Sequence, residues 1–180
     1  ARARRSASAW TPSPARPRPN MTRRMAYLGP PGTFSEEAAL LYDTSAQLLP
    51  FPSRRAVATA VETGLADEGV VAIENSLEGS VTDTLDLLIH ESRLSITWEL
   101  VLPIHHHLLV KEGVQFQDIK AIYSHPQALG QCRRFLERCF PKAPTQAAMS
   151  TTVAVEEMLA SAVPAAAIAP RRAADIYGVR

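Results

Sequence analysis

Short apolar runs alternate with helical patterns along most of the chain, and this alternation constrains the fold more than any other feature of the sequence. The runs favour β-strands, and the segments between them repeat their apolar residues with the period of a helix. Strands that alternate with helices are typical of α/β proteins, in which helices cover a largely parallel sheet. The sequence therefore predicts an α/β fold.

The individual elements follow from the same patterns. Strands are predicted at residues 25–28, 48–51, 69–73, 94–102, 107–110, 119–123, 146–149 and 165–169. Helices are predicted after residues 33 and 53, and at residues 81–90, 126–140, 152–161 and 170–177. Thr33 is a typical N-cap, and Glu36 three residues later predicts a capping box. The all-apolar run at 69–73 predicts a strand covered on both faces. Leu85, Leu88 and Ile89 are the expected core stripe of the helix at 81–90.

The composition is that of a globular protein with an acidic body. Hydrophobic residues make up 46% and charged residues 21% of the 180 residues, so a packed core is expected. The first 24 residues contain seven arginines and no acid, which leaves 12 basic against 18 acidic residues in the rest of the chain. Nucleic acid is therefore not the expected partner, because phosphate contacts need a surplus of Lys and Arg. No apolar run reaches the roughly 18 residues of a membrane span, so no membrane partner is expected.

The cysteines and the N-terminus bear on the compartment. Cys132 and Cys139 lie seven residues apart on one predicted helix, which separates them by about 10.5 Å along its axis and excludes a disulfide. Two reduced cysteines suit the cytoplasm, and the first residues contain no apolar segment of a secretory signal. We therefore predict a cytoplasmic protein.

Residues 1–24 are predicted to be a disordered leader, because they are rich in Arg, Pro, Ser and Ala and contain few large apolar residues. Two interpretations stay open. The segment is Arg-rich and free of acids, as transit peptides are, or it is an extension upstream of Met21 or Met25. We favour the extension, because the segment shows neither an amphipathic pattern nor a cleavage signal.

Polar and small residues follow four of the predicted strands. They are the junctions at 29–33 (GPPGT), 74–76 (ENS), 124–125 (SH) and 150–152 (STT). Ligands of open α/β sheets bind beyond the carboxyl ends of the strands, and the free N–H groups of helix N-termini attract anions. For any single junction a helix cap is the better explanation of its Ser or Thr, because caps outnumber ligand sites. Together the junctions favour a site for a small anion, in particular one with two carboxylates.

Three segments resemble signatures of the prephenate dehydratase family. They are residues 27–35 (YLGPPGTFS), 73–81 (IENSLEGSV) and 124–132 (SHPQALGQC). Residues 150–152 and 166–178 continue the likeness, which runs from Met25 to Arg180 in the order of the family's motifs.

The resemblance implies a fold of two small α/β lobes, similar to type II periplasmic binding proteins, with the active site in the cleft between them. We place the lobes at residues 25–103 and 104–180, joined near Pro103. The implied enzyme is a carbon–oxygen lyase of phenylalanine biosynthesis. It removes the ring hydroxyl and CO2 from prephenate, a small dicarboxylate, and releases phenylpyruvate. Aromatisation drives this reaction, so no metal or organic cofactor is implied. A homo-oligomer is expected for the full-length enzyme.

Site residues can be carried over from the matching motifs. The implied substrate-binding residues are Asn75, Ser76, Ser124, Gln127, Gln131, Thr151 and Thr152. Gln127 and Gln131 are four residues apart on a helix and so share a face. Glu74 and His125 are the candidates for proton delivery. A salt bridge is an equally good explanation of Glu74, and a structural role before the helix-opening Pro126 is the better explanation of His125.

The sequence also departs from the family. A Thr-Arg-Phe motif, whose Thr is expected to assist departure of the hydroxyl, does not occur in the chain, nor does a segment matching the regulatory ACT domain. Removal of one preorganised donor costs about 10²–10³ in rate. We therefore expect little or no dehydratase activity from these 180 residues alone.

Two further alternatives concern the ligand. Arogenate dehydratase is the nearest alternative function, and a catalytically silent binding module of periplasmic-binding-protein type is another. A metal site is not predicted, although residues 105–107 are three consecutive histidines. Only His105 and His107 would share a face of a strand, and two ligands without a third make a weak site.

Overall fold

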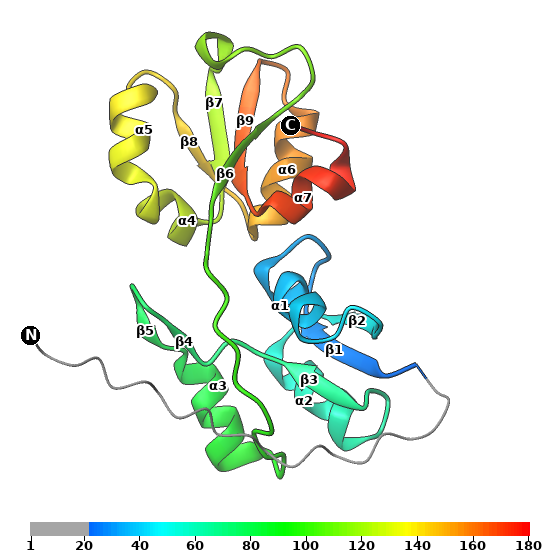
Figure 1. Cartoon of the computed structure of the whole chain (residues 1–180). Helices are drawn as coiled ribbons and strands as arrows, with labels where there is room; N and C mark the ends of the chain where they lie inside the picture. Colours follow the sequence, from blue (N-terminus) through cyan, green and yellow to red (C-terminus); the bar gives the residue numbers. More distant parts are fainter. Residues whose placement is uncertain (1–21) are drawn as a thin grey trace, which may run out of the picture.

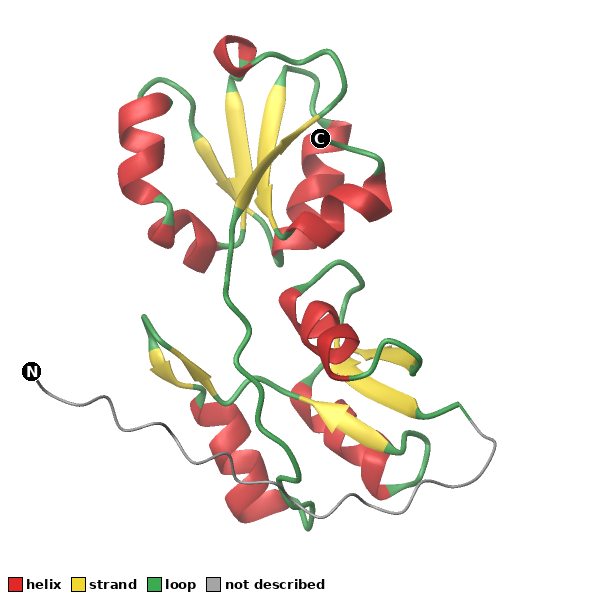
Figure 2. Ribbon diagram, in the orientation of Figure 1, coloured by secondary structure: helices red, strands yellow, loops and turns green. Residues whose placement is uncertain are grey.

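The structure is a computed structural model that describes residues 22–180. Two sheets with their own helices lie one above the other in Figures 1 and 2, and residues 92–106 run between them. The predicted α/β fold is therefore confirmed. Our predictions for the leader fall on residues 1–24, of which all but the last three lie outside the described residues.

The first sheet has three parallel strands with β1 (Arg24–Leu28) between β2 (Gln47–Phe51) and β3 (Glu68–Val70). Successive residues of β1 face opposite sides. Ala26 packs with the buried face of α2 (Arg54–Glu62), while Met25 and Tyr27 pack with Ala39 of α1 (Phe34–Tyr42). The two helices thus cover opposite faces, and both begin at the carboxyl edge of the sheet.

The segment after β3 differs from the prediction. The strand expected at 69–73 ends at Val70 at the edge of the sheet, and Ile73 is exposed rather than covered on both faces. A short hairpin of β4 (Glu74–Asn75) and β5 (Gly79–Ser80) follows.

The next helix, α3 (Thr82–Asp86), continues into the π-helical turn η1 (Leu87–Glu91). Its buried residues are Thr84 and Leu87, whereas Ile89 of the predicted stripe is 68% exposed. The Thr84 hydroxyl donates to the carbonyl of Ala72 at 2.7 Å, which fixes this face of the helix inward.

No strand forms at residues 94–102, so this prediction was wrong. A strand is stable only when a neighbouring strand pairs with it, and no element in the described part of the chain pairs with this segment. It runs as an irregular connection with Ile96, Trp98 and Val101 exposed. The boundary that we place at residue 103 lies within this connection and stays a proposal.

The second sheet has the order β6-β9-β7-β8, with β6 antiparallel and the other pairs parallel. Its strands are β6 (His107–Val110), β7 (Ala121–Ser124), β8 (Thr145–Ala147) and β9 (Ala165–Ala169). Its helices are η2 (Phe116–Asp118), α4 (Pro126–Gln131), α5 (Arg133–Cys139), α6 (Thr151–Ala160) and α7 (Arg171–Tyr177). The single helix predicted at 126–140 is thus two helices that meet at Cys132. Cys132 and Cys139 are free, as expected.

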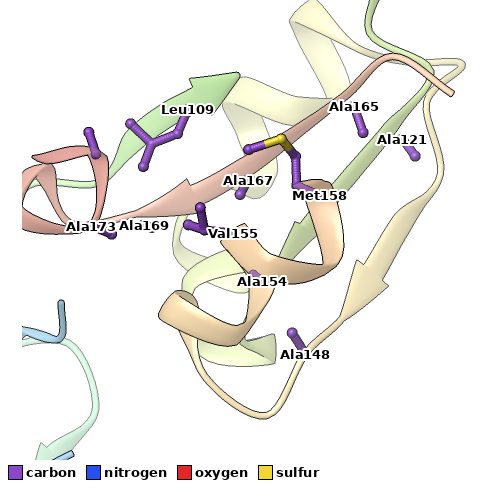
Figure 3. Close-up of a cluster of buried hydrophobic side chains, with 11 residues drawn as sticks. Leu109, Ala121, Ala148, Ala154, Val155, Met158, Ala165, Ala167, Ala169 and Ala173 are labelled. Carbon is purple, nitrogen blue, oxygen red and sulfur yellow. The ribbon is translucent and has the colours of Figure 1, made fainter. Parts of the chain in front are cut away.

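Every residue of the central strand β9 is buried, and four of its five residues are alanine. Small side chains let α6 approach the strand closely, so that Val155 and Met158 fill the space beside Ala167 and Ala169 (Figure 3). The other face is filled by larger residues of β7, α5 and β9, among them Ile122, Leu136 and Ile168. This packing fixes the position of the α6 N-terminus.

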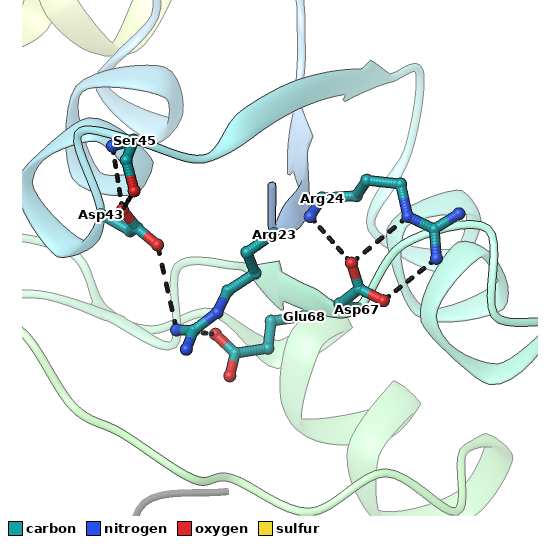
Figure 4. Close-up of polar contacts among 6 residues, drawn as sticks. All are labelled: Arg23, Arg24, Asp43, Ser45, Asp67 and Glu68. Atoms are coloured by element: carbon teal, nitrogen blue, oxygen red, sulfur yellow. Dashed lines mark hydrogen bonds and ion pairs between the residues drawn. The ribbon is translucent and has the colours of Figure 1, made fainter. Parts of the chain in front are cut away.

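Arg23 and Arg24, at the beginning of β1, form ion pairs with acidic residues before β2 and at the start of β3 (Figure 4). Arg24 forms a two-point contact with Asp67, with an Nη2–Oδ1 distance of 3.0 Å. Nη1 of Arg23 lies 3.4 Å from Oε2 of Glu68 and 4.0 Å from Oδ2 of Asp43. Hydrogen bonds from the Ser45 hydroxyl and N–H lower the pKa of Asp43 below its usual value. These contacts fix the register of the sheet at the edge opposite the junctions.

Ser124 joins two strands of the second sheet. It is fully buried, and its hydroxyl donates to the Ile168 carbonyl at 2.6 Å. Replacing Ser124 by Ala leaves that carbonyl without this donor, so we expect the free energy of unfolding to fall by about 1–3 kcal/mol. Urea denaturation measures the loss. Ser161→Ala is the matched control, because the Ser161 hydroxyl also donates to a carbonyl, at 3.0 Å, but in an exposed loop. Equal losses in both variants would contradict this role of Ser124.

Candidate functional site

The two lobes touch at the glycine-rich junction 29–33. Gly32 has a φ of +87°, and a Cβ built on it would lie 3.3 Å from Cγ2 of Thr152 and 3.4 Å from Cδ1 of Ile176. Both contacts come from the second lobe, Thr152 from the N-terminus of α6 and Ile176 from α7. The junction is therefore closed by direct packing. The positive φ favours glycine here, and a Cβ would be crowded against the Thr152 methyl group.

Glu36 is the polar centre of this contact. Its side chain is only 8% exposed, and its carboxylate accepts the Gly32 N–H at 2.7 Å and Nε of Arg172 at 3.3 Å. The predicted capping box is half formed. Thr33 Oγ1 accepts the Glu36 N–H at 3.5 Å, but the carboxylate binds Gly32 instead of returning to the N-cap. Burial, and next the negative charge of Glu36, raise the pKa of the neighbouring Tyr27 to about 12.

A second contact joins the lobes on the hairpin side. The side-chain amide of Gln127, at the start of α4, donates to the carboxylate of Glu78 in the turn between β4 and β5. This contact is exposed to solvent. Gln127 therefore bridges the two lobes.

Gln131, one turn later, faces the connection between the lobes. Its Oε1 lies 2.8 Å from Nε2 of His106. The His106 ring also meets the ring of Phe34 edge-on at 5.5 Å, and Phe34 begins α1. Gln127 and Gln131 thus point from one helix to the hairpin and to the connection, respectively.

The acidic junction after β3 lies in the hairpin. Glu74 and Ser76 are exposed, and the Asn75 side-chain oxygen accepts the N–H groups of Leu77 at 2.9 Å and Glu78 at 3.3 Å. This turn leaves the Asn75 NH2 group as the part of the side chain able to reach a ligand. The assignment of these three residues to a site stays a prediction.

The hydroxyl junctions of the second lobe differ in exposure. Ser124 belongs to β7 itself rather than following it, and both Ser124 and Thr152 have no exposed surface. Thr151 is half-buried at the start of α6, which is capped by Ser150. In this conformation only Thr151 presents surface to a ligand, and the substrate-binding roles of all three side chains remain predictions.

His125 has a local role that the sequence suggested. It is the N-cap of α4, and its Nδ1 accepts the N–H of Gln127 at 3.3 Å. A ring that caps a helix in this way needs an unprotonated Nδ1. Its role in proton delivery is untested.

A cavity of about 520 Å³ lies in the first lobe, beside the carboxyl end of β1. It is lined by the N-terminus of α2 and one side of α3, with ion pairs between Arg54 and Asp83 at 3.4 Å and between Arg55 and Glu91. These residues are not among the site residues predicted from the sequence. Two arginines in the first turn of a helix are unfavourable, because the helix dipole already places positive charge there. This unusual pair in the sequence could have indicated that acidic side chains lie beside them.

The histidine run does not gather ligands. No group of three or more His, Cys, Asp or Glu side chains placed to hold a metal occurs among residues 22–180. The His106 side chain, which the strand pattern had excluded, contacts Gln131 and Phe34, whereas His107 lies in β6 and pairs with Ala169 of β9. No helix in this range is long and apolar enough to cross a membrane.

The family model of prephenate dehydratase matches residues 25–180. The motifs that meet at the contact between the lobes all lie within this range. The chain belongs to the prephenate dehydratase family. Arogenate dehydratase 5 of Arabidopsis thaliana, named as chloroplastic, is 40% identical over 169 residues, which are 93% of this chain and 39% of that protein. The bifunctional chorismate mutase/prephenate dehydratase of Stutzerimonas stutzeri is 41% identical over 157 residues, 87% of this chain and 42% of that protein.

Solved structures of the prephenate dehydratase family share the fold. The prephenate dehydratase of Arthrobacter aurescens, solved with L-Phe, superposes with a TM-score of 0.80 at 33% identity, over 87% of this chain and 53% of that one. The fold is thus the type II periplasmic-binding-protein-like fold, as predicted. The chain spans about two fifths of the length of these curated relatives.

The contact at Gly32 gives a test with an internal control. Gly32→Ala should destabilise the protein by about 1–2 kcal/mol through its positive φ, and the added Cβ should also crowd Thr152 Cγ2 at 3.3 Å. Gly64 has a φ of +73° but nothing within 4 Å of a built Cβ, so Gly64→Ala introduces similar strain without the contact. Urea denaturation should show a larger loss of stability for Gly32→Ala than for Gly64→Ala. Equal losses in both variants would contradict the contact.

Proposed function

We propose that this chain forms the two-lobed substrate-binding part of a prephenate dehydratase, which converts prephenate to phenylpyruvate. The observation that carries the proposal is that the contacts between the lobes are made by residues of the family motifs. Gly32 packs against Thr152, and Glu78 binds Gln127. The motifs of both lobes therefore face the same region, where one small ligand could contact both.

The proposed chemistry needs positioning more than covalent participation. Prephenate loses its ring hydroxyl together with CO2, and formation of the aromatic ring drives both losses. The site must hold two carboxylates and give a proton or a hydrogen bond to the departing hydroxyl. In the proposal the Asn75 amide and Ser76 hydroxyl bind from the hairpin, and the free N–H groups at the start of α6 with Thr151 bind from the second lobe.

The exposure and the contacts of Glu74 and His125 distinguish the two candidates for proton delivery. Glu74 is exposed on the hairpin, next to Asn75, and can reach a ligand there. His125 has its Nδ1 engaged as a helix cap. Glu74 is therefore the better of the two proposed acids within this chain. We further propose that the enzyme acts in the cytoplasm as a homo-oligomer, without a metal or an organic cofactor.

Arogenate is the second candidate substrate, and the 40% identity to an arogenate dehydratase favours it. Arogenate carries an amino-acid side chain where prephenate carries a keto acid, so both have two carboxylates and the same leaving groups. A site that accepts arogenate must also accept an ammonium group, for which Glu74 and Glu78 on the hairpin are suitable partners.

Calorimetric titration distinguishes the substrates. We expect the 180-residue chain to bind prephenate more tightly than phenylpyruvate, because phenylpyruvate has lost one of the two carboxylates that the site is proposed to hold. Arogenate titrated in parallel tests the second candidate, and tighter binding of arogenate would select it. Binding of neither dicarboxylate would contradict the proposed function.

Asn75 can be tested without disturbing the hairpin. Asn75→Asp keeps the side-chain oxygen that accepts the N–H groups of Leu77 and Glu78, but it replaces the NH2 donor by negative charge. We expect prephenate binding to weaken by about 1–3 kcal/mol or more while the unfolding transition stays unchanged. Asp86→Asn, on the exposed side of α3, alters charge in the same lobe away from the hairpin and serves as the control. Unchanged affinity in Asn75→Asp would remove Asn75 from the site.

A further inference from the structure

Arg172 connects the two lobes through an ion pair. It lies in the first turn of α7 in the second lobe, and its Nε is 3.3 Å from Oε2 of Glu36 in the first lobe. The two residues are 136 positions apart in the sequence. Arg172 is the one cation within ion-pair distance of Glu36 in the described part of the chain.

The first lobe makes its own contacts with Glu36, independent of Arg172. The carboxylate accepts the Gly32 N–H at 2.7 Å, and its helix α1 packs on β1. The Glu36 side chain is 8% exposed, whereas that of Arg172 is 39% exposed. A buried carboxylate that loses its cationic partner is left uncompensated, which strongly disfavours that state. The acceptor is therefore preorganised, and Arg172 is the movable partner.

We propose that Arg172 is a positioning residue, whose ion pair with Glu36 holds the second lobe closed on the glycine-rich junction 29–33. The pair lies beside the packing of Gly32 against Thr152 and Ile176. Closure at this point brings the N-terminus of α6 to the first lobe. The effect on ligand binding rests on the proposed function, whereas the effect on lobe geometry does not.

The contacts on the two sides of the connection differ in strength. The Glu36–Arg172 pair is part-buried on the Glu36 side, but the Glu78–Gln127 hydrogen bond is exposed to solvent. Exposed polar contacts contribute little to stability. The lobes therefore separate first on the hairpin side, where Asn75 and Ser76 lie. The Glu36–Arg172 pair on the α7 side keeps them in contact, and we call this pair the clasp.

Fluorescence energy transfer between the lobes tests the clasp. Dyes are placed at Leu65→Cys in the first lobe and Glu112→Cys in the second, both exposed positions, after Cys132→Ser and Cys139→Ser remove the native thiols. Single-molecule measurements without ligand should show a narrow distribution of transfer efficiency for the parent protein. Arg172→Gln should broaden and shift it.

Three further variants separate the ion pair from general damage. Arg171→Gln removes the same charge from the exposed neighbouring position on α7 and should leave the distribution unchanged. Arg172→Lys keeps the charge and should restore part of the parent distribution. Glu36→Gln can still accept the Gly32 N–H but has no charge, so it should show the same transfer distribution as Arg172→Gln. The double variant should shift the distribution no further than either single variant, because both substitutions remove the same ion pair.

Titration of the same proteins with prephenate completes the test. Arg172→Gln should bind prephenate about fivefold or more weakly, because the ligand must then supply the closure itself. An unchanged transfer distribution in both Arg172→Gln and Glu36→Gln would overturn the proposal. If the parent protein binds neither prephenate nor arogenate, the proposed function fails, while the transfer distributions still decide whether the clasp exists.

Discussion

The buried carboxylate of Glu36 is the interaction on which the arrangement of the lobes depends. A carboxylate that is almost removed from solvent needs both hydrogen bonds and a counter-charge. The first lobe supplies the hydrogen bond from Gly32, and the second lobe supplies the charge of Arg172. Neither lobe satisfies the group alone, so its burial links the conformation of the glycine-rich junction to the position of α7.

That link reaches the candidate site because of how the second sheet is packed. The alanines of β9 let α6 lie close to the strand, and α7 continues directly from the end of β9. Residues of α6, α7 and β9 therefore belong to one packed core. When Arg172 fixes α7 on the first lobe, Thr152 is placed against Gly32, and the N–H groups at the start of α6 face the first lobe. The packing of the β9 alanines against α6 thus determines where the N-terminus of α6 lies and where it could bind an anion.

Local signals in the sequence predicted local structure well. Thr33 caps its helix as expected, because a cap depends only on residues a few positions away. The helices predicted after residue 53 and from residue 152 also form, with Ser53 and Ser150 as their N-caps. The strand predicted at 94–102 failed because pairing depends on a partner elsewhere in the chain. The resemblance indicated the family correctly. The Glu36–Arg172 pair could not be predicted, since its partners are 136 residues apart and Arg172 resembles any exposed helix residue in the sequence.

A second group at this contact carries a cost of its own. The Thr152 hydroxyl is fully buried and has no hydrogen-bond partner among the described residues, and such a hydroxyl costs about 1–3 kcal/mol relative to a hydrated one. The part of Thr152 that faces Gly32 is its methyl group, Cγ2, so the residue contributes packing to the contact while its polar atom stays unsatisfied. In the proposed function, an arrangement of the lobes that let a ligand carboxylate accept this hydroxyl would remove the cost, and binding would favour that arrangement.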